Sequence, residues 1–170
     1  MSQKAIFEKH LPFTLDFGVD SSHIDGIGHL NNAVYVDWCQ QAGWAHSLAL
    51  GLDLSHYQEL DAAMVIRRAN YDYIQSAYIG DACVMATWLT NSDGKLIMER
   101  EFQLVRKADG KTLLRAHWQL VCIRMSNGKP RRMPPAFIKR YGDAVIAAQP
   151  QSKPSGDATK PSASVMFPAQ

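Results

Sequence analysis

The fold is decided by one stretch, His23-Ile-Asp-Gly-Ile-Gly-His-Leu-Asn-Asn-Ala-Val-Tyr35, which separates a strand pattern from a helix pattern. Before it, apolar and polar residues alternate over residues 13–19, which predicts a short strand with one buried face. After it, apolar residues recur at helical spacing over residues 34–49, and Asn31 or Asn32 can cap this helix. The sequence therefore predicts a strand, a glycine-rich loop and a long helix in direct succession.

Four more strand patterns follow the helix, over residues 63–73, 83–89, 96–106 and 112–124. Turn residues at 91–94 and 108–110 join the last three, which we expect to form an antiparallel meander. Residues of one parity are expected to share a face, namely Val65, Ala69, Tyr71 and Tyr73 in the first pattern and Leu96, Met98, Phe102 and Leu104 in the third. A short last helix is expected over residues 136–141, after two prolines.

One long helix followed by antiparallel strands is typical of the α+β class, with the helix packed against a curved sheet. Gly43 lies in the middle of the helix, where glycine costs about 1 kcal/mol relative to alanine. Close packing of the helix on the sheet would compensate for this cost, and Gly51 can end the helix. The separation of helix and strands argues against a parallel Rossmann-type sheet.

The sequence changes character at residue 149. Proline, serine and alanine dominate residues 149–170, and hydrophobic periodicity ends there. We therefore expect one domain over residues 1–148 and a tail over residues 149–170. The apolar group Val165-Met-Phe-Pro168 is either part of a loosely ordered end or a docking segment for a partner.

The composition describes one globular domain of 170 residues, with 46% hydrophobic and 20% charged residues. A formal net charge of +2 gives no support for a nucleic-acid or membrane binder, which would need a clustered basic face. The three cysteines, Cys39, Cys83 and Cys122, are widely spaced and form no zinc or redox motif. Free thiols, no signal peptide and no long apolar run together predict a cytoplasmic protein.

Common catalytic motifs are missing from the sequence. It contains no G-x-S-x-G nucleophile elbow, no P-loop and no H-E-x-x-H metal motif. The six histidines are scattered along the chain, so we expect no metal site.

The chemistry that remains lies in the loop before the helix. The first N–H groups of a helix have no partner within it, and the helix dipole adds partial positive charge there. A carbonyl oxygen placed at this end would be polarised, and an oxyanion would be stabilised. Gly26 and Gly28 would let the backbone approach a ligand closely, and Asp25 could face the carbonyl from the other side. Turn chemistry alone, with Asp25 in an Asx-turn and Asn31 or Asn32 as cap, is the alternative explanation.

This stretch resembles the signature of hotdog-fold thioesterases of the 4-hydroxybenzoyl-CoA thioesterase type, which commonly reads D-x-D-x-x-G-H-V-N-N-x-x-Y before a helix. The chain matches it at Asp25, Gly28-His29, Asn31-Asn32 and Tyr35, and departs from it at His23, which replaces the first Asp. A weaker resemblance to the family's Y-x-x-P-x-x-x-G-D lies at residues 73–81, where Ser replaces the proline. Together the resemblances cover residues 11–141.

The resemblance implies a hotdog fold, in which a curved antiparallel sheet wraps around one long helix. It implies an acyl-CoA thioesterase that releases free acid and CoA, with Asp25 as nucleophile or general base. The backbone N–H of Asn32 would form the oxyanion hole, and His29 would support the reaction by orienting the carbonyl or a water. Gly28 and Asn31 would contact the substrate. His23 in place of the first Asp leaves a second-carboxylate role and the specificity open.

The resemblance also implies that coenzyme A enters only as part of the substrate, with no other cofactor. Its phosphates would need basic side chains, for which the group Lys129, Arg131 and Arg132 is the candidate. A homodimer or homotetramer is implied, with the pocket between subunits. The acyl group is left open, and its pocket could be lined by Trp38, Trp44, Met64 or Tyr71, which could equally be core residues.

Two other functions compete with hydrolysis. A hotdog dehydratase acting on hydroxyacyl thioesters needs a pocket histidine and an acid on the helix, and Asp37 is the only carboxylate on the long helix. A non-catalytic acyl-CoA-binding or assembly protein would bind the ligand without turnover.

Overall fold

The computed structural model describes residues 6–146. The predicted tail, with its apolar group at residues 165–168, lies outside the described residues and stays a prediction. The elements in chain order are β1 (Phe13–Gly18), the 3-10 turn η1 (Ser21–His23), α1 (Asn32–Ala49), α2 (Leu54–Glu59), β2 (Ala63–Tyr73), β3 (Ala82–Ser92), β4 (Ile97–Arg106), β5 (Thr112–Ile123) and α3 (Pro135–Asp143).

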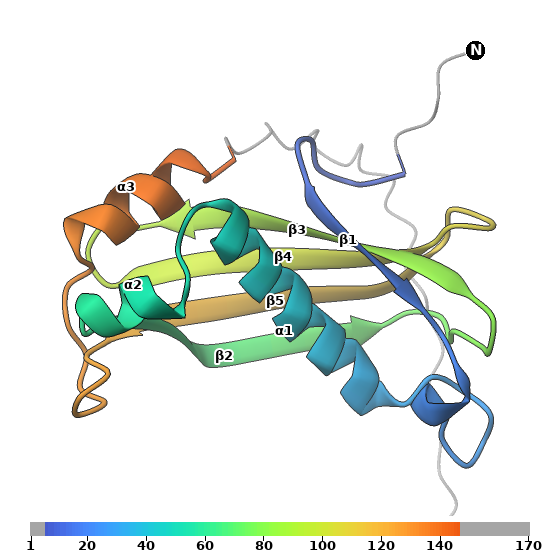
Figure 1. Cartoon of the computed structure of the whole chain (residues 1–170). Helices are drawn as coiled ribbons and strands as arrows, with labels where there is room; N and C mark the ends of the chain where they lie inside the picture. Colours follow the sequence, from blue (N-terminus) through green and yellow to red (C-terminus); the bar gives the residue numbers. More distant parts are fainter. Residues whose placement is uncertain (1–5, 147–170) are drawn as a thin grey trace, which may run out of the picture.

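The strands form one antiparallel sheet in the order β1-β3-β4-β5-β2, with β1 and β2 at its edges. The helix α1 crosses one face of this curved sheet, and α2 and α3 lie at the end of the sheet where α1 finishes (Figure 1). The expected meander of β3, β4 and β5 is confirmed, and β3 is almost wholly buried, as its apolar sequence predicts. The α+β class and the hotdog arrangement are both confirmed.

A bulge in β2 corrects one expected face of the sheet. The pairing with β5 runs Ile66 to Leu120 and then Arg68 to Gln119, so Arg67 is an extra residue. Side chains therefore change parity at the bulge. Before the bulge, Met64 and Ile66 lie on the sheet face that packs against α1. After it, Ala69, Tyr71 and Tyr73 lie on that same face. The expectation for these last three positions is confirmed, and the expectation that Val65 joins them is wrong.

The helix α1 begins and ends as its sequence predicts. The side chain of Asn31 caps it by accepting a hydrogen bond from the N–H of Ala33 at 2.9 Å. In mid-helix, Gly43 lets α1 approach the sheet, because a Cβ there would lie 3.3 Å from the Trp118 ring. Gly51 follows the helix with a φ of 77°, and Arg140 from α3 donates to its carbonyl at 2.7 Å.

The short helix α2 was not expected from the sequence. Its six residues are too few to show a helical period, and a local cap defines it instead. A carboxylate oxygen of Asp53 accepts a hydrogen bond from the backbone N–H of His56 at 3.0 Å. Tyr57 is the buried residue of this helix, and it brings its ring against Phe137 of α3.

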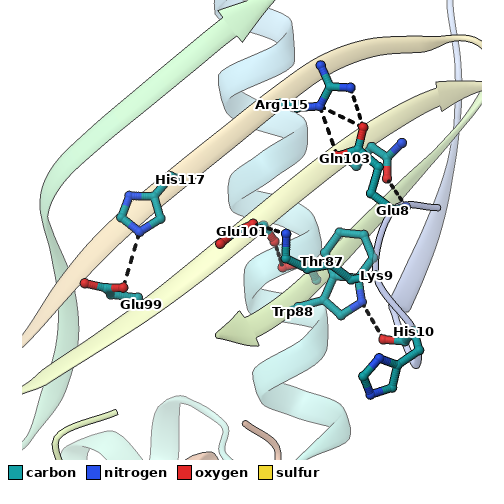
Figure 2. Close-up of polar contacts among 10 residues, drawn as sticks. All are labelled: Glu8, Lys9, His10, Thr87, Trp88, Glu99, Glu101, Gln103, Arg115 and His117. Atoms are coloured by element: carbon teal, nitrogen blue, oxygen red, sulfur yellow. Dashed lines mark hydrogen bonds and ion pairs between the residues drawn. The ribbon is translucent and has the colours of Figure 1, made fainter. Parts of the chain in front are cut away.

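The sheet face away from α1 carries charged and polar side chains beside Trp88, and the segment of Glu8, Lys9 and His10 lies against it (Figure 2). Lys9 forms an ion pair with Glu101 at 2.7 Å, and His117 lies 3.5 Å from Glu99. Trp88 donates from its indole nitrogen to a backbone carbonyl in the same N-terminal segment at 2.9 Å. Within the described residues, no helix is both long and apolar enough to cross a bilayer.

Candidate active site

The loop between β1 and α1 closes on itself through short hydrogen bonds. At its base, the backbone N–H of Asn31 donates to the carbonyl of His23 at 2.9 Å, and Ile24 pairs with Leu30 in an antiparallel bridge. The imidazole of His23 accepts a hydrogen bond from the backbone of Asp20 at 3.2 Å. Here His23, the departure from the family signature, helps to hold the loop. The loop therefore presents the residues between Ile24 and Leu30 as a compact tip.

Asp25 is held in this tip by the backbone around it. Its Oδ1 accepts hydrogen bonds from the N–H groups of Ile27 at 3.0 Å and His29 at 3.1 Å. The reversal of the chain uses Gly28 at a φ of 84°, a conformation that favours glycine. Within residues 6–146, Oδ2 of Asp25 has no hydrogen-bond partner. One carboxylate oxygen is thus fixed by the loop, and the other is available to a ligand.

The start of α1 supplies a hydrogen-bond donor close to this loop. Asn32 is the first residue of the helix. The side chain of Asn31 accepts its hydrogen bond from the N–H of Ala33, not from that of Asn32. In the part of the chain that the structure describes, the backbone N–H of Asn32 therefore has no acceptor. The positive end of the helix dipole lies at the same place, which favours a developing negative charge there.

These groups meet in a cavity of about 220 Å³. Asp25, His29 and Asn32 line it from the loop and from α1. Its remaining walls come from the same loop, from α1, from the end of β2 and from the segment that follows β2, namely Ile27, Leu30, Tyr35, Tyr73, Ile74, Gln75 and Ser76. Gly28 and Asn31 flank the cavity without lining it. Three of the five residues expected in the loop are thus brought to one cavity.

The segment after β2 holds His29 in position. The Oγ of Ser76 lies 3.3 Å from Nδ1 of His29, and the ring of Tyr78 meets the imidazole edge-on. Tyr35 is buried, and its hydroxyl accepts a hydrogen bond from the backbone N–H of Ala77 at 3.2 Å. Ser76 is the residue that replaces the proline of the weaker family signature. The signature at residues 73–81 is visible in the sequence, but it did not predict that this segment lines the cavity.

Comparison with known proteins identifies the family of the chain. A family model described as the thioesterase-like superfamily matches residues 19–141. The chain belongs to this superfamily. The match begins before the loop of Asp25 and ends in α3, so it includes the whole cavity. It confirms the family resemblance seen in the sequence and the expected class of enzyme, a thioester hydrolase.

Solved structures share the fold of this superfamily member at low sequence identity. A 1,4-dihydroxy-2-naphthoyl-CoA thioesterase from Synechocystis is 20% identical, with a TM-score of 0.69 over 78% of this chain and 96% of its own. A Staphylococcus aureus protein in complex with CoA is 17% identical, with a TM-score of 0.73 over 89% and 96%. The probable thioesterase YbaW from Escherichia coli is 20% identical, with a TM-score of 0.67 over 79% and 99%. A search of curated proteins found no match.

The basic residues considered for CoA lie far from this cavity within one chain. Lys129, Arg131 and Arg132 belong to the segment between β5 and α3, at the opposite end of the sheet from the loop of Asp25 (Figure 1). The Nη1 of Arg131 donates to the carbonyls of Leu60 at 2.8 Å and Asp61 at 3.0 Å, so this side chain holds the turn after α2. Lys129 and Arg132 are exposed.

The helix carboxylate that a hotdog dehydratase would need lies outside the site. Asp37 is exposed on α1, and it accepts a hydrogen bond from the Gln41 side chain at 2.7 Å. It does not line the cavity of Asp25 and His29.

A second and larger cavity, of about 460 Å³, lies beside the C-terminal half of α1. Of the four residues considered for an acyl pocket, Trp44 and Met64 line it. Trp38 is buried against the ring of Phe17, and Tyr71 accepts a hydrogen bond from the indole of Trp118 at 2.9 Å. Trp38 is therefore a core residue, and the partly buried Tyr71 packs against the core.

Proposed function

We propose that the protein is an acyl-CoA thioesterase that hydrolyses its substrate to a free acid and CoA at the cavity of Asp25. The observation that carries this proposal is that one cavity holds a carboxylate oxygen of Asp25 and a backbone N–H of Asn32, neither of which has a hydrogen-bond partner among the described residues. Membership of the thioesterase-like superfamily and the CoA complex of a structural relative support the choice of substrate.

In this proposal the thioester carbonyl lies between the two groups. Its oxygen accepts a hydrogen bond from the Asn32 N–H, which stabilises the oxyanion as the carbonyl carbon becomes tetrahedral. Asp25 acts on the opposite side. As a general base, its Oδ2 takes a proton from the attacking water, and as a nucleophile, it first forms an acyl-enzyme anhydride that water then hydrolyses. In both routes the C–S bond breaks and the thiolate of CoA leaves.

The loop fixes Asp25 for either route. Because Oδ1 already accepts two backbone hydrogen bonds, the carboxylate has little freedom to rotate. His29 lines the same cavity and is itself held by Ser76, so it supports the reaction by orienting the carbonyl or a water. The proposal needs no metal ion and no cofactor beyond the coenzyme A of the substrate.

We propose further that the working unit is a homodimer or homotetramer with the site between subunits. The edge strand β2 carries eleven residues whose outer side has no partner strand among the described residues. Three large exposed apolar side chains line the cavity, namely Ile27, Tyr73 and Ile74, and two more, Tyr78 and Ile79, follow shortly after it in the chain. A second copy would cover this surface and could bring its own basic segment to the CoA phosphates. Light scattering that finds only a 19.0 kDa monomer at micromolar concentration would contradict this.

A panel of acyl-CoAs, assayed for released thiol, tests the proposed activity. The panel includes aromatic, short-chain and long-chain acyl groups, and one hydroxyacyl-CoA. We expect free thiol from at least one acyl-CoA and no enoyl thioester from the hydroxyacyl-CoA. An enoyl thioester without released thiol would favour the dehydratase. Tight binding of every acyl-CoA without turnover would favour a binding protein.

A further inference from the structure

The larger cavity contains a charged side chain that the proposed reaction does not use. Arg100 of β4 lines this cavity, although only 2% of the residue is exposed. Its cross-strand neighbour is Trp118, and both side chains face α1. The other walls are mostly apolar and come from α1, α2, α3 and three strands. A guanidinium has thus been placed inside a mostly apolar cavity, where an uncompensated charge is costly.

The hydrogen bonds of Arg100 satisfy only part of this guanidinium. Its Nη1 contacts Nδ1 of His46 at 2.9 Å and Oγ1 of Thr87 at 3.2 Å. Within residues 6–146, Nε and Nη2 have no hydrogen-bond acceptor. These two nitrogens carry the parallel N–H groups along one side of the guanidinium, and this is the side that binds a carboxylate in a bidentate manner.

Within the part of the chain that the structure describes, no group neutralises this charge. Among the described residues, no Asp or Glu lines the cavity or forms an ion pair with Arg100. Burial lowers the pKa of Arg100 to about 10, so the guanidinium is still charged at neutral pH. Burial and Arg100 lower the pKa of His46 to about 4, so the imidazole is neutral and its Nδ1 accepts the hydrogen bond.

The hydroxyl groups nearby already bond to one another. Tyr141 donates to the Oγ of Ser47 at 3.1 Å, and Ser47 donates to the carbonyl of Gly43 at 3.2 Å. The hydroxyl of Tyr57 is in contact with that of Tyr141. Burial raises the pKa of Tyr57, so this phenol is not a counter-ion for Arg100 either. Among the arginine and these three hydroxyl-bearing residues, the donors without an acceptor are therefore Nε and Nη2 of Arg100.

We propose that this cavity binds an organic acid with an apolar body, whose carboxylate pairs with Nε and Nη2 of Arg100. A carboxylate has the planar, two-oxygen geometry that matches these N–H groups. The apolar walls suit an alkyl or aromatic body, and about 460 Å³ is within the usual range for small-molecule sites. The acid is either a free molecule or the far end of an acyl group that carries a second carboxylate.

Calorimetric titration of the full chain with octanoate and octan-1-ol tests this site without any need for turnover. Hydrogen bonds between charged groups are stronger than those between neutral groups. We therefore expect the acid to bind at least about tenfold more tightly than the alcohol. Arg100→Met keeps an apolar chain of similar reach and removes the charge, so it should reduce the preference to below about twofold. Arg115→Met makes the same change on the exposed opposite face and should leave the preference intact.

Three results would overturn the proposal. They are no binding of octanoate, equal binding of the alcohol, and a preference for the acid that survives in Arg100→Met. If Arg100→Met fails to fold, Met64→Trp fills the cavity from its wall and leaves Arg100 unchanged. Binding of octanoate with wild-type affinity by that variant would be equally decisive against the site.

A second arm of the experiment distinguishes the two sources of the acid. The kcat/KM for octanedioyl-CoA, which carries a far carboxylate, is compared with that for octanoyl-CoA. A preference for octanedioyl-CoA that Arg100→Met removes assigns the carboxylate to the acyl group, a result that rests on the proposed function. An unchanged ratio, together with Arg100-dependent binding of octanoate, assigns the site to a free acid. Absence of turnover refutes the proposed function, whereas the titration still decides on the site.

Discussion

The two ends of α1 carry two cavities that are built in different ways. At the N-terminal end, the polar groups that face a ligand are a loop carboxylate and a backbone N–H, and neighbours in the sequence hold them. Beside the C-terminal half, the cavity is larger and mostly apolar, and among the described residues the charged group that lines it is the buried side chain of Arg100. The first arrangement stabilises charge that develops during a reaction, whereas the second suits charge that is already present on a ligand.

This difference separates chemistry from recognition along one helix. A backbone donor at a helix start is fixed before any substrate arrives, so it costs no reorganisation when charge develops. A buried arginine without a counter-ion gains most when an anion enters, because the anion removes the cost of the isolated charge. We therefore expect substitutions at the N-terminal end to change turnover, and substitutions at the other end to change binding and stability.

The largest effect is expected from Asp25→Asn, which keeps the shape of the side chain and removes its charge. Loss of a positioned general base should lower kcat by about 10²–10⁴-fold, and loss of a nucleophile by more. Because Asp25 contributes little to the core, the free energy of unfolding should change by no more than about 1–2 kcal/mol. Steady-state kinetics on the best acyl-CoA and chemical denaturation measure the two effects.

His29→Ala is the matched comparison within the same cavity, and it should cost less than the change at Asp25 if His29 only orients groups. Mass spectrometry must exclude deamidation of the new asparagine. The catalytic role of Asp25 is refuted if the folded variant turns over its substrate within about threefold of wild type.

A smaller effect is expected at the close contact between α1 and the sheet. Gly43→Val should destabilise the protein by about 1–3 kcal/mol, because the added atoms would meet the Trp118 ring, which is already 3.3 Å from a Cβ at this position. Gly142→Val in α3 is the control, since no atom lies within 4 Å of a Cβ there, and it should change stability by less than about 0.5 kcal/mol. Equal effects in thermal or chemical unfolding would show that Gly43 does not set the spacing of α1.

The smallest effect concerns pH and the neutral partner of Arg100. The pKa of His46 is about 4 in the folded protein, lowered by burial and by Arg100, against about 6.5 in an unfolded chain. Between these values the unfolded chain binds more protons, so the free energy of unfolding falls as the pH falls. With the full pKa shift, the free energy of unfolding would fall by about 2 kcal/mol between pH 7 and pH 5. Because the ring is only partly buried, we expect a fall of about 1 kcal/mol.

His46→Gln should remove that part of the pH dependence, because glutamine can still accept a hydrogen bond but does not titrate. Denaturation of both proteins at pH 7 and pH 5 gives the difference directly, and contributions from the other histidines and the carboxylates cancel. Identical pH dependence in the two proteins would contradict the neutral state of His46 and the charge state assigned to Arg100 and His46 in the larger cavity.

The N-terminal site was predictable from sequence because its parts are contiguous. Asp25, His29 and Asn32 lie within eight residues, and the cap by Asn31 and the turn at Gly28 fix their geometry locally. The fold followed from the same stretch and from the alternating strands. The short helix α2 was missed because a cap, and not a hydrophobic period, defines it.

The larger cavity was harder to predict because it depends on how distant strands align. In sequence, Arg100 stands between Glu99 and Glu101 and has the appearance of a solvated charge. The alternation of side chains along the strand was the available signal. Arg100 lies two residues from Met98 and from Phe102, which were both expected on the buried face. The bulge at Arg67 depends on the register of β2 against β5, which no local pattern in β2 reveals.

The most direct test of the account is a crystal structure of Asp25→Asn with its best acyl-CoA, since the slow variant would preserve the substrate. We predict that the thioester oxygen lies within hydrogen-bond distance of the Asn32 backbone N–H, with the side chain at position 25 on the opposite side of the carbonyl carbon. A thioester bound beside Arg100, or anywhere outside the cavity at the start of α1, would contradict the assignment of this end of the helix as the catalytic site.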